Sequence, residues 1–222
     1  MAVYDLEEQE QLDELKTWWK RYGNLVTGIL LAAAVAAVGW QGWNWYQRNQ
    51  TAQASAVFVA LQQAADKGDA RRTRELAGEL IDKFSGTTYA AMGVLISAKL
   101  QVDGGDAKGA RPQLVWAAEK AADPALRDLA RLRLAVVLLD DKALDEAAAL
   151  LAREPSPAFL PRYYELKGDV LVAQGKAADG KAAYDSGIKQ LELRQKAAGV
   201  EGDPGLYAEL LRAKRDRAGS VK

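Results

Sequence analysis

An uncharged, mainly apolar run extends from Gly23 to Tyr46, between Arg21 and Arg48. As a helix it would span about 36 Å at 1.5 Å per residue, and the hydrocarbon core of a bilayer is roughly 30 Å thick. Aromatic residues, which favour the membrane–water interface, lie at both of its ends. They are Trp18, Trp19 and Tyr22 on one side and Trp40, Trp43, Trp45 and Tyr46 on the other. The pattern predicts a transmembrane helix over residues 23–46.

Two other interpretations of this run are a buried helix of a soluble core and a cleaved signal peptide. A buried helix in a soluble core rarely needs aromatic belts at both ends. A signal peptide would require a small-residue cleavage site, and Ala34-Val35-Ala36 offers one. That site, however, falls in the middle of the apolar run, and the region before the run is long and acidic. We therefore expect an uncleaved anchor.

Small residues recur at helical spacing within the anchor. Gly28, Ala32 and Ala36 fall at i, i+4 and i+8, and Gly39 lies close to the same face. Small side chains let two transmembrane helices approach closely, although an alanine-rich segment also meets this spacing by chance. These four residues are the candidates for a helix-packing face.

Residues 1–22 are predicted to form a cytoplasmic tail that contains an amphipathic helix. The apolar positions of that helix are Leu12, Leu15, Trp19 and Tyr22. Lys16, Lys20 and Arg21 precede the anchor closely, whereas Arg48 alone follows it closely. Because basic residues beside a membrane helix tend to stay in the cytoplasm, we expect the N-terminus inside and the remaining chain across the membrane.

Residues 47–222 are predicted to be all-α. Good helix formers dominate, and β-branched alternation is nearly absent. Clusters of Gly, Pro, Asp and other turn residues divide the region into helix-length pieces. The clusters lie at 67–69, 85–87, 103–106, 123–124, 140–141, 155–157, 174–176 and 202–205. We expect a carboxylate at such a site, including the Asp140-Asp141 pair, to cap a helix.

The helical pieces repeat in pairs. Small and larger apolar residues recur at the offsets of the tetratricopeptide unit, and equivalent positions at Ala98, Ala135 and Gly168 approach its 34-residue period. The last unit matches best, with Gly168, Leu171, Gly175, Gly180, Tyr184 and Gly187. A degenerate first unit covers about 55–84, and a helix over about 206–217 is predicted to cap the solenoid. The alternative is an irregular helical bundle.

In a tetratricopeptide solenoid the first helix of each pair lines the concave surface. Such a groove, apolar with flanking charges, suits a segment of another protein. The candidate groove residues are Met92, Leu95, Lys99, Val102, Arg162, Glu165, Asp169 and Val172.

Composition argues against catalysis. The chain has no cysteine and no histidine, so thiolate chemistry and the commonest general base are missing. No nucleotide loop or metal-ligand cluster is present in the sequence, and the net charge of zero gives no reason to expect nucleic acid as a partner. We predict a protein that is not an enzyme and needs no cofactor, the alternative being a carboxylate-dependent hydrolase with converging acids.

Residues around the anchor and in the last repeat carry a family resemblance. The stretch MAVYDLEEQEQLDELKTWWKRYGN before it, GWQGWNWYQ at its end and YYELKGDVLVAQGKAADGKAAYDSGI over 163–188 resemble the YfgM-like family of ancillary SecYEG translocon subunits. The resemblance implies a single-pass inner-membrane protein with a periplasmic tetratricopeptide domain. Its implied partners are the SecYEG translocon, a PpiD-like periplasmic folding factor, exported polypeptides and membrane lipid.

The leading hypothesis is therefore a non-enzymatic adaptor in the bacterial inner membrane. Its periplasmic helical-repeat domain would bind a folding factor or exported proteins that emerge from the translocon. The alternative is a scaffold for periplasmic envelope-assembly or cell-division complexes. The two hypotheses share one fold and differ in the partner.

Overall fold

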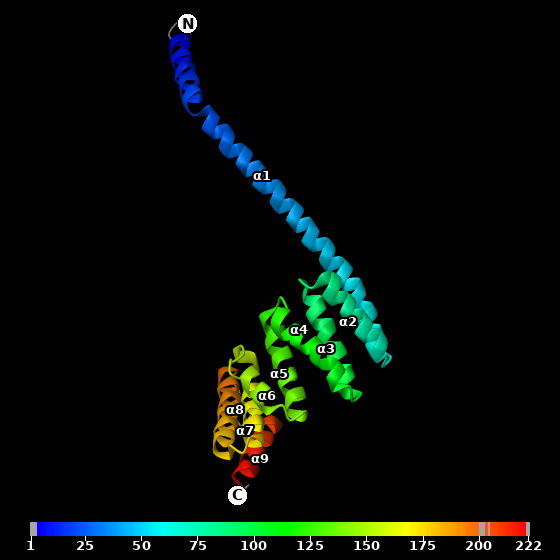
Figure 1. Cartoon of the computed structure of the whole chain (residues 1–222). Coiled ribbons are helices and arrows are strands. Elements are labelled where there is room, and N and C mark those ends of the chain that lie inside the picture. Colours follow the sequence, from blue (N-terminus) through cyan, green and yellow to red (C-terminus); the bar gives the residue numbers. More distant parts are fainter. Residues whose placement is uncertain (1–3, 200–202, 204, 221–222) are drawn as a thin grey trace. The chain divides into compact units, whose positions relative to one another are not determined.

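The computed structural model describes residues 4–199, 203 and 205–220, and every regular element within them is helical. The chain forms two compact units, Met1–Gln50 and Thr51–Lys222 (Figure 1). Residues 1–3 of the predicted tail, and part of the predicted break at 202–205, lie outside the described residues. The all-α prediction is confirmed.

The helices follow one another with short connections. Their bounds are α1 Tyr4–Asp66, α2 Ala70–Phe84, α3 Thr88–Asp103, α4 Ala107–Lys120, α5 Pro124–Asp140, α6 Leu144–Leu150, the 3₁₀ helix η1 Pro157–Phe159, α7 Leu160–Ala173, α8 Ala177–Ala197 and α9 Leu206–Ser220. Seven of the eight predicted breaks lie wholly in described residues, and each falls at or beside a helix end. The agreement follows from Gly, Pro and Asp, which disfavour helix interiors.

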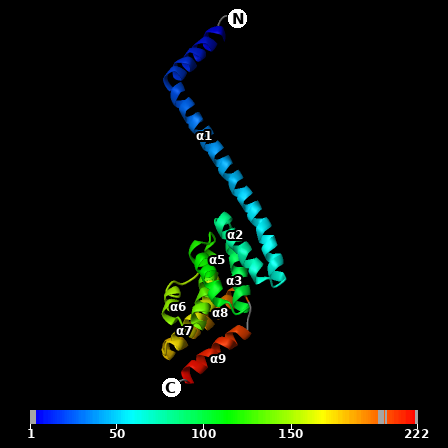
Figure 2. The same ribbon diagram turned by 45° about the vertical axis from the view of Figure 1, so that its right-hand side comes forward.

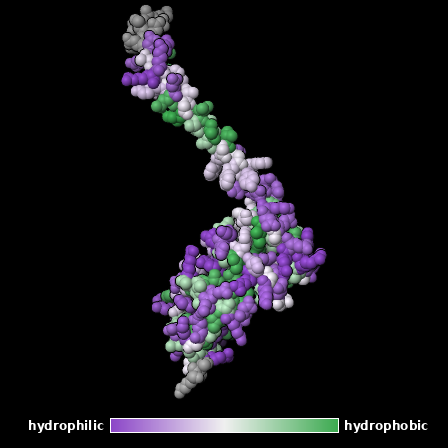
Figure 3. Space-filling view, in the orientation of Figure 1, coloured by the Kyte–Doolittle hydropathy of each residue, from purple (hydrophilic) through white to green (hydrophobic). Residues whose placement is uncertain are grey.

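In the first unit α1 carries the predicted membrane segment. The helix contains a window long and apolar enough to cross a membrane. Its large apolar side chains face outward, for example Leu25, Val35 and Trp40, which are 61%, 67% and 71% exposed. Figure 3 shows this apolar surface as a band with paler residues at both ends. A helix whose apolar side chains have no protein around them is suited to lipid, and the prediction of one N-terminal membrane-length helix is confirmed.

In the second unit the helices pack as successive hairpins (Figures 1 and 2). The last part of α1, residues 51–66, pairs with α2, and α3/α4, α5/α6 and α7/α8 follow. The helix α9 packs on α8 and closes the series, as the predicted capping helix would. One continuous core of buried apolar residues joins the first three hairpins to α7. The predicted solenoid of helix hairpins is confirmed.

Four of the helices in the second unit begin at a side-chain cap. The side chains of Asp69, Thr87, Asp106 and Asp123 accept a hydrogen bond from a backbone N–H in the first turn of α2, α3, α4 and α5. The expectation that Asp140 and Asp141 also cap was wrong. Both are exposed at the carboxyl end of α5, and the residue before α6 is Ala143, which has no side-chain cap.

The four hairpins turn in the same way. In each turn one residue has a positive φ: Gly68 (71°), Gly105 (83°), Lys142 (60°) and Gly175 (79°). Its backbone N–H donates to the carbonyl three residues back, and the next N–H donates to the carbonyl five residues back. Glycine adopts this left-handed conformation at no steric cost. The spacing of Gly68, Gly105 and Gly175 in the sequence therefore indicates the period of the repeat.

Small residues permit the helices of a hairpin to cross closely. A Cβ on Gly168 of α7 would overlap the ring of Tyr184 in α8, and a Cβ on Gly180 would lie 2.6 Å from Val172 Cγ2. Between successive hairpins, Gly93 of α3 similarly faces Leu80 of α2 and Leu61 of α1. Gly168 and Gly180 are small positions of the repeat pattern, and they permit the close approach of α7 and α8.

Candidate functional site

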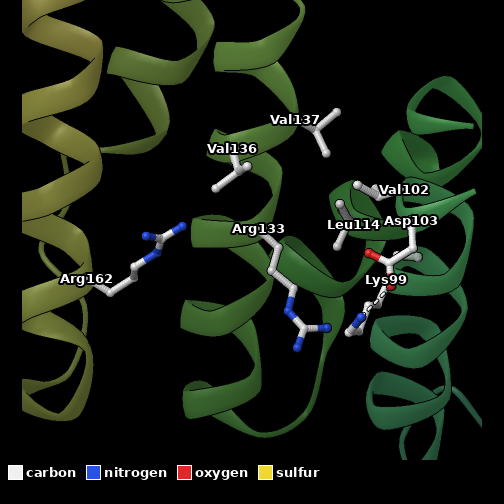
Figure 4. A pocket seen from close by; sticks show the side chains of 9 residues that line it. Lys99, Val102, Asp103, Leu114, Arg133, Val136, Val137 and Arg162 are labelled. Carbon is white, nitrogen blue, oxygen red and sulfur yellow. Dashed lines mark hydrogen bonds and ion pairs between the residues drawn. The ribbon is translucent and has the colours of Figure 1, made fainter. Parts of the chain in front are cut away.

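A cavity of about 250 Å³ opens between α3, α5 and α7. Its apolar wall consists of Ala98, Val102, Leu114, Val136 and Val137. Its charged lining consists of Lys99, Asp103, Arg133 and Arg162 (Figure 4). Three cations and one carboxylate thus surround the apolar wall. The cavity exists because α3, α5 and α7 are the first helices of consecutive hairpins and line the same surface of the solenoid.

Arg133 is the central cation of the cavity. One guanidinium N–H donates to the backbone carbonyl of Leu95 on α3, at 2.9 Å. Burial lowers the pKa of Arg133, and the nearby Asp103 carboxylate opposes this effect. Among the ion pairs of the described residues, none includes Arg133. A half-buried cation without a carboxylate at contact distance is unusual, because burying an unpaired charge costs free energy.

The other two cations lie on either side of Arg133. Lys99 pairs with Asp103 one turn along α3, and both side chains are mostly exposed. Arg162 donates to the Glu165 carboxylate at 2.5 Å, one turn along α7. Exposed ion pairs contribute little free energy, so Lys99 is able to exchange Asp103 for another carboxylate. The partner of Arg162 is buried, and Arg162 has further N–H donors with which to bind a second carboxylate.

Glu165 and Asp169 on α7 face the C-terminal helix. The Glu165 side chain is only 2% exposed and accepts hydrogen bonds from Tyr207 Oη at 2.6 Å and Lys214 Nζ at 2.7 Å. Asp169 accepts from Lys214 as well, and from Tyr184 Oη at 2.8 Å. The two carboxylates therefore bind α9 to the last hairpin.

The ionisation of this cluster reflects its partners. Burial raises the pKa of Glu165, but hydrogen bonds from Lys214, Tyr207 and Arg162 outweigh burial and hold that pKa below its ordinary value. Burial lowers the pKa of Lys214, but Asp169 and Glu165 outweigh burial and raise it. The pKa of Tyr207 is raised by burial and by its hydrogen bond to Glu165. At neutral pH the Glu165 carboxylate and the Lys214 ammonium are therefore charged.

The structure divides the eight predicted groove residues into three sets. Lys99, Val102 and Arg162 line the cavity, and Leu95 is buried beside it, where its carbonyl accepts from Arg133. Met92 is exposed elsewhere on α3. Glu165 and Asp169 contact α9, and Val172 packs against the small core of α8 and α9. That these residues form a partner groove stays a prediction.

Sequence reasoning missed the contribution of α5. Arg133, Val136 and Val137 line the cavity, yet only α3 and α7 supplied predicted residues. The signal was available, because Val136 has the same repeat offset as Lys99 and Asp169. The repeat offsets identify Val136, whereas Arg133 and Val137 have no equivalent among the predicted groove residues.

The predicted packing face of the anchor is exposed within the first unit. Gly28, Ala32, Ala36 and Gly39 all lie on the surface of α1. A Cβ added at Gly28 or Gly39 would meet nothing within 4 Å. The face is available to lipid or another helix, and its use for packing stays a prediction.

The described residues contain no group of three or more Asp or Glu side chains placed to hold a metal ion. Their most buried carboxylates, Asp128 and Glu165, are engaged by donors. Burial raises the pKa of Asp128, but the Ser156 backbone N–H and Arg131 outweigh it, and the pKa lies below its ordinary value. In this part of the chain, the buried carboxylates therefore secure helices and loops.

Comparison with known proteins places this chain in a family. Residues 16–215 match the tetratricopeptide repeat-like domain family. The chain belongs to this family. The match includes most of α1 and ends within α9, so the tetratricopeptide repeat-like assignment covers the membrane segment and all four hairpins.

Curated relatives of this tetratricopeptide repeat-like protein share one name, ancillary SecYEG translocon subunit. The Neisseria gonorrhoeae protein is 30% identical, over 86% of this chain and 91% of its own length. The Haemophilus influenzae protein is 28% identical, over 82% and 89%. The Escherichia coli protein is 26% identical, over 85% and 90%. No solved structure matches the chain significantly. The family resemblance carried by the anchor and the last repeat is confirmed.

Proposed function

We propose that this protein is a non-enzymatic adaptor of the Sec translocon, anchored in the inner membrane by α1. The observation that carries the proposal is the similarity to ancillary SecYEG translocon subunits, which extends over more than four fifths of the chain. In this proposal the second unit lies in the periplasm and binds a folding factor or exported polypeptides as they emerge.

The structure supplies two features that an adaptor needs. The exposed apolar segment of α1 is suited to lipid, and the cavity between α3, α5 and α7 offers a concave surface to a partner segment. The orientation rests on Lys16, Lys20 and Arg21 before the anchor against Arg48 after it. A protein without histidine or cysteine is also better suited to binding than to acid–base or thiol chemistry.

Site-specific photocrosslinking in bacterial cells that express the full chain tests the proposal. One probe at Ala32 reports on the anchor, and one at Lys99 reports on the rim of the cavity. A control probe at Arg71, whose side chain is 91% exposed on α2, reports on a surface outside the cavity. The adducts are identified by mass spectrometry.

We expect SecY, SecE or SecG at Ala32, and a folding factor or exported chains at Lys99, with neither enriched at Arg71. Adducts with division or wall-assembly proteins instead would favour the scaffold hypothesis and contradict the adaptor proposal. Crosslinks to lipid alone at Ala32 would contradict the role given to the anchor.

A further inference from the structure

The cavity between α3, α5 and α7 has a lining that specifies the chemistry of its ligand. We propose that it binds acidic side chains of an extended segment of another polypeptide, with an aliphatic side chain of that segment against the apolar wall. The inference rests on the proposed adaptor function and adds to it the type of sequence that is recognised.

Arg133 supplies the central contact. It is half-buried, one N–H is used by the Leu95 carbonyl, and no ion pair of the described residues involves it. A guanidinium has five N–H donors in a planar fork that matches a carboxylate. A carboxylate from a ligand would remove the cost of the unpaired buried charge, so the site favours an acidic ligand over a neutral one.

The charges around Arg133 extend this preference along the groove. Lys99 on α3 and Arg162 on α7 lie on opposite sides of Arg133, and Asp103 is the single acidic residue in the lining (Figure 4). A negatively charged segment therefore finds complementary charge from three successive hairpins. A positively charged segment would be repelled at the same three points.

The apolar wall lies between the cations. Its side chains, which include Val102, Leu114, Val136 and Val137, favour contact with an aliphatic group because the contact removes apolar surface from water. In an extended chain, alternate side chains point to the same side and lie about 6.6 to 7 Å apart. A segment with acidic, aliphatic and acidic residues at every second position therefore presents all three side chains to the cavity, with the acidic ones toward the cations and the aliphatic one toward the valines.

The arrangement favours side-chain carboxylates over the carboxylate at a chain terminus. The three cations belong to three different helices and are spread across the opening (Figure 4). A terminal carboxylate brings one charge to one point. A segment with several acidic side chains engages the cations from α3, α5 and α7 together.

Peptide binding to the full chain in lipid nanodiscs tests the inference. The probes are short fluorescein-labelled peptides with amidated C-termini. Their central residues at every second position, each separated by one serine, are Glu-Leu-Glu, Gln-Leu-Gln or Glu-Ser-Glu. A further peptide contains no acidic side chain and keeps a free terminal carboxylate. Fluorescence anisotropy gives the dissociation constant of each peptide.

We expect Glu-Leu-Glu to bind at least about tenfold more tightly than Gln-Leu-Gln, because charge-assisted hydrogen bonds are lost with the amides. Glu-Ser-Glu should bind with intermediate affinity, since it keeps the charges and loses the apolar contact. Raising the salt concentration should weaken Glu-Leu-Glu most.

Matched variants locate the binding to this cavity. Arg133→Gln should weaken Glu-Leu-Glu about tenfold, and Arg133→Lys should weaken it less. Lys99→Gln changes a largely exposed side chain, so it tests the charge without threatening the fold, and a smaller loss is expected. Arg153→Gln, at an exposed arginine outside the cavity, should change nothing.

Equal affinity for Glu-Leu-Glu and Gln-Leu-Gln would overturn the inference, as would binding by the peptide with the free terminal carboxylate alone. Unchanged affinity in both Arg133→Gln and Lys99→Gln would overturn it as well. These results leave translocon crosslinks at Ala32 intact and the adaptor proposal standing. Loss of those crosslinks contradicts the adaptor proposal, and it is measured in a separate experiment.

Discussion

At the scale of single residues, Glu165 is the side chain that holds the C-terminal helix in place. It is buried on α7 and accepts hydrogen bonds from Tyr207 and Lys214 of α9 and from Arg162. Its pKa in the folded protein lies below the ordinary value for glutamate, because the three donors outweigh burial. The folded state therefore binds this proton less readily than the unfolded chain, so folding stability depends on pH.

The stability that Glu165 contributes is expected to decrease at acidic pH. The contribution of Glu165 to stability is complete above the ordinary glutamate pKa, about 4.3, and is lost as pH falls through the lower pKa of the folded state. We expect Glu165→Gln to cost about 2 kcal/mol at neutral pH, since its charged hydrogen bonds are weakened. It should also flatten the loss of stability below about pH 4.

Urea unfolding of the full chain in detergent, followed by circular dichroism at several pH values, measures both effects. Glu192→Gln, at an exposed glutamate of α8, is the matched control and should leave the pH dependence unchanged. A Glu165→Gln variant with the same acid dependence as the unmodified chain would show that Glu165 does not carry the linkage.

At the scale of secondary-structure elements, the close crossing of α7 and α8 depends on glycine at position 168, which has no side chain. A Cβ at Gly168 would overlap the ring of Tyr184, which is buried between the helices. A Cβ added at Gly78 of α2 would meet no atom within 4 Å. The two glycines therefore respond to the same substitution with opposite signs.

We expect Gly168→Ala to lower the free energy of unfolding by about 2 kcal/mol, since overpacking forces the helices apart. Gly78→Ala should raise it by roughly 0.5 to 1 kcal/mol, because alanine favours a helix. Urea unfolding monitored by circular dichroism compares the two variants. Equal effects at both positions would contradict the close crossing at Gly168.

The elements themselves were largely predictable, and their long-range contacts were not. Gly68, Gly105 and Gly175 mark the hairpin turns because few other residues adopt a positive φ. The contact of Lys214 with Glu165 joins residues 49 positions apart, and no helical spacing encodes it. The sequence therefore did not show that Glu165 and Asp169, two of the predicted groove residues, contact α9.

The cavity residues likewise differ in whether the sequence could identify them. Helix periodicity indicates which side of α3 and α7 faces the groove, and so it identified Lys99, Val102 and Arg162. It does not indicate which charged side chain lacks a partner. Arg133 is distinguished by its burial against the Leu95 carbonyl, and that depends on how α5 packs on α3.

At the scale of the whole molecule, the apolar segment of α1 is expected to hold the protein in the membrane. Val35→Arg places a charge in the middle of the apolar window of α1, at a cost of about 2.5 to 3.5 kcal/mol for insertion. Part of the protein should then leave the membrane pellet after carbonate extraction. The control Val59→Arg, at an exposed position of the second unit, should remain in the pellet. Complete retention of Val35→Arg would contradict the position of the anchor.

The orientation in the membrane is testable because the chain has no cysteine of its own. Single cysteines at Asp13 and Lys189 lie on the two sides of the predicted anchor. A membrane-impermeant maleimide added to spheroplasts should label Lys189→Cys at once and Asp13→Cys only after permeabilisation. The opposite result would place the second unit in the cytoplasm and contradict the orientation derived from the basic residues.

Lys142 gives the third hairpin a special position in the array. It adopts the left-handed conformation that glycine adopts in the other three turns, which costs about 1 to 2 kcal/mol. The helix that follows, α6, has only seven residues and no side-chain cap. In hydrogen–deuterium exchange we expect the α6 amides to exchange faster than those of α4 and α8, and Lys142→Gly to slow them.

In a linear array each unit depends on its neighbours, so the least stable repeat decides where cooperativity breaks. Opening at α6 would remove its packing on α7 and leave the direct contact of α5 with α7 to join the last hairpin to the earlier ones. It would also free one face of α5, the helix that carries Arg133. The strained turn at Lys142 thus makes the third repeat the point where the solenoid is expected to unfold locally, and ties that local unfolding to the lifetime of a bound segment.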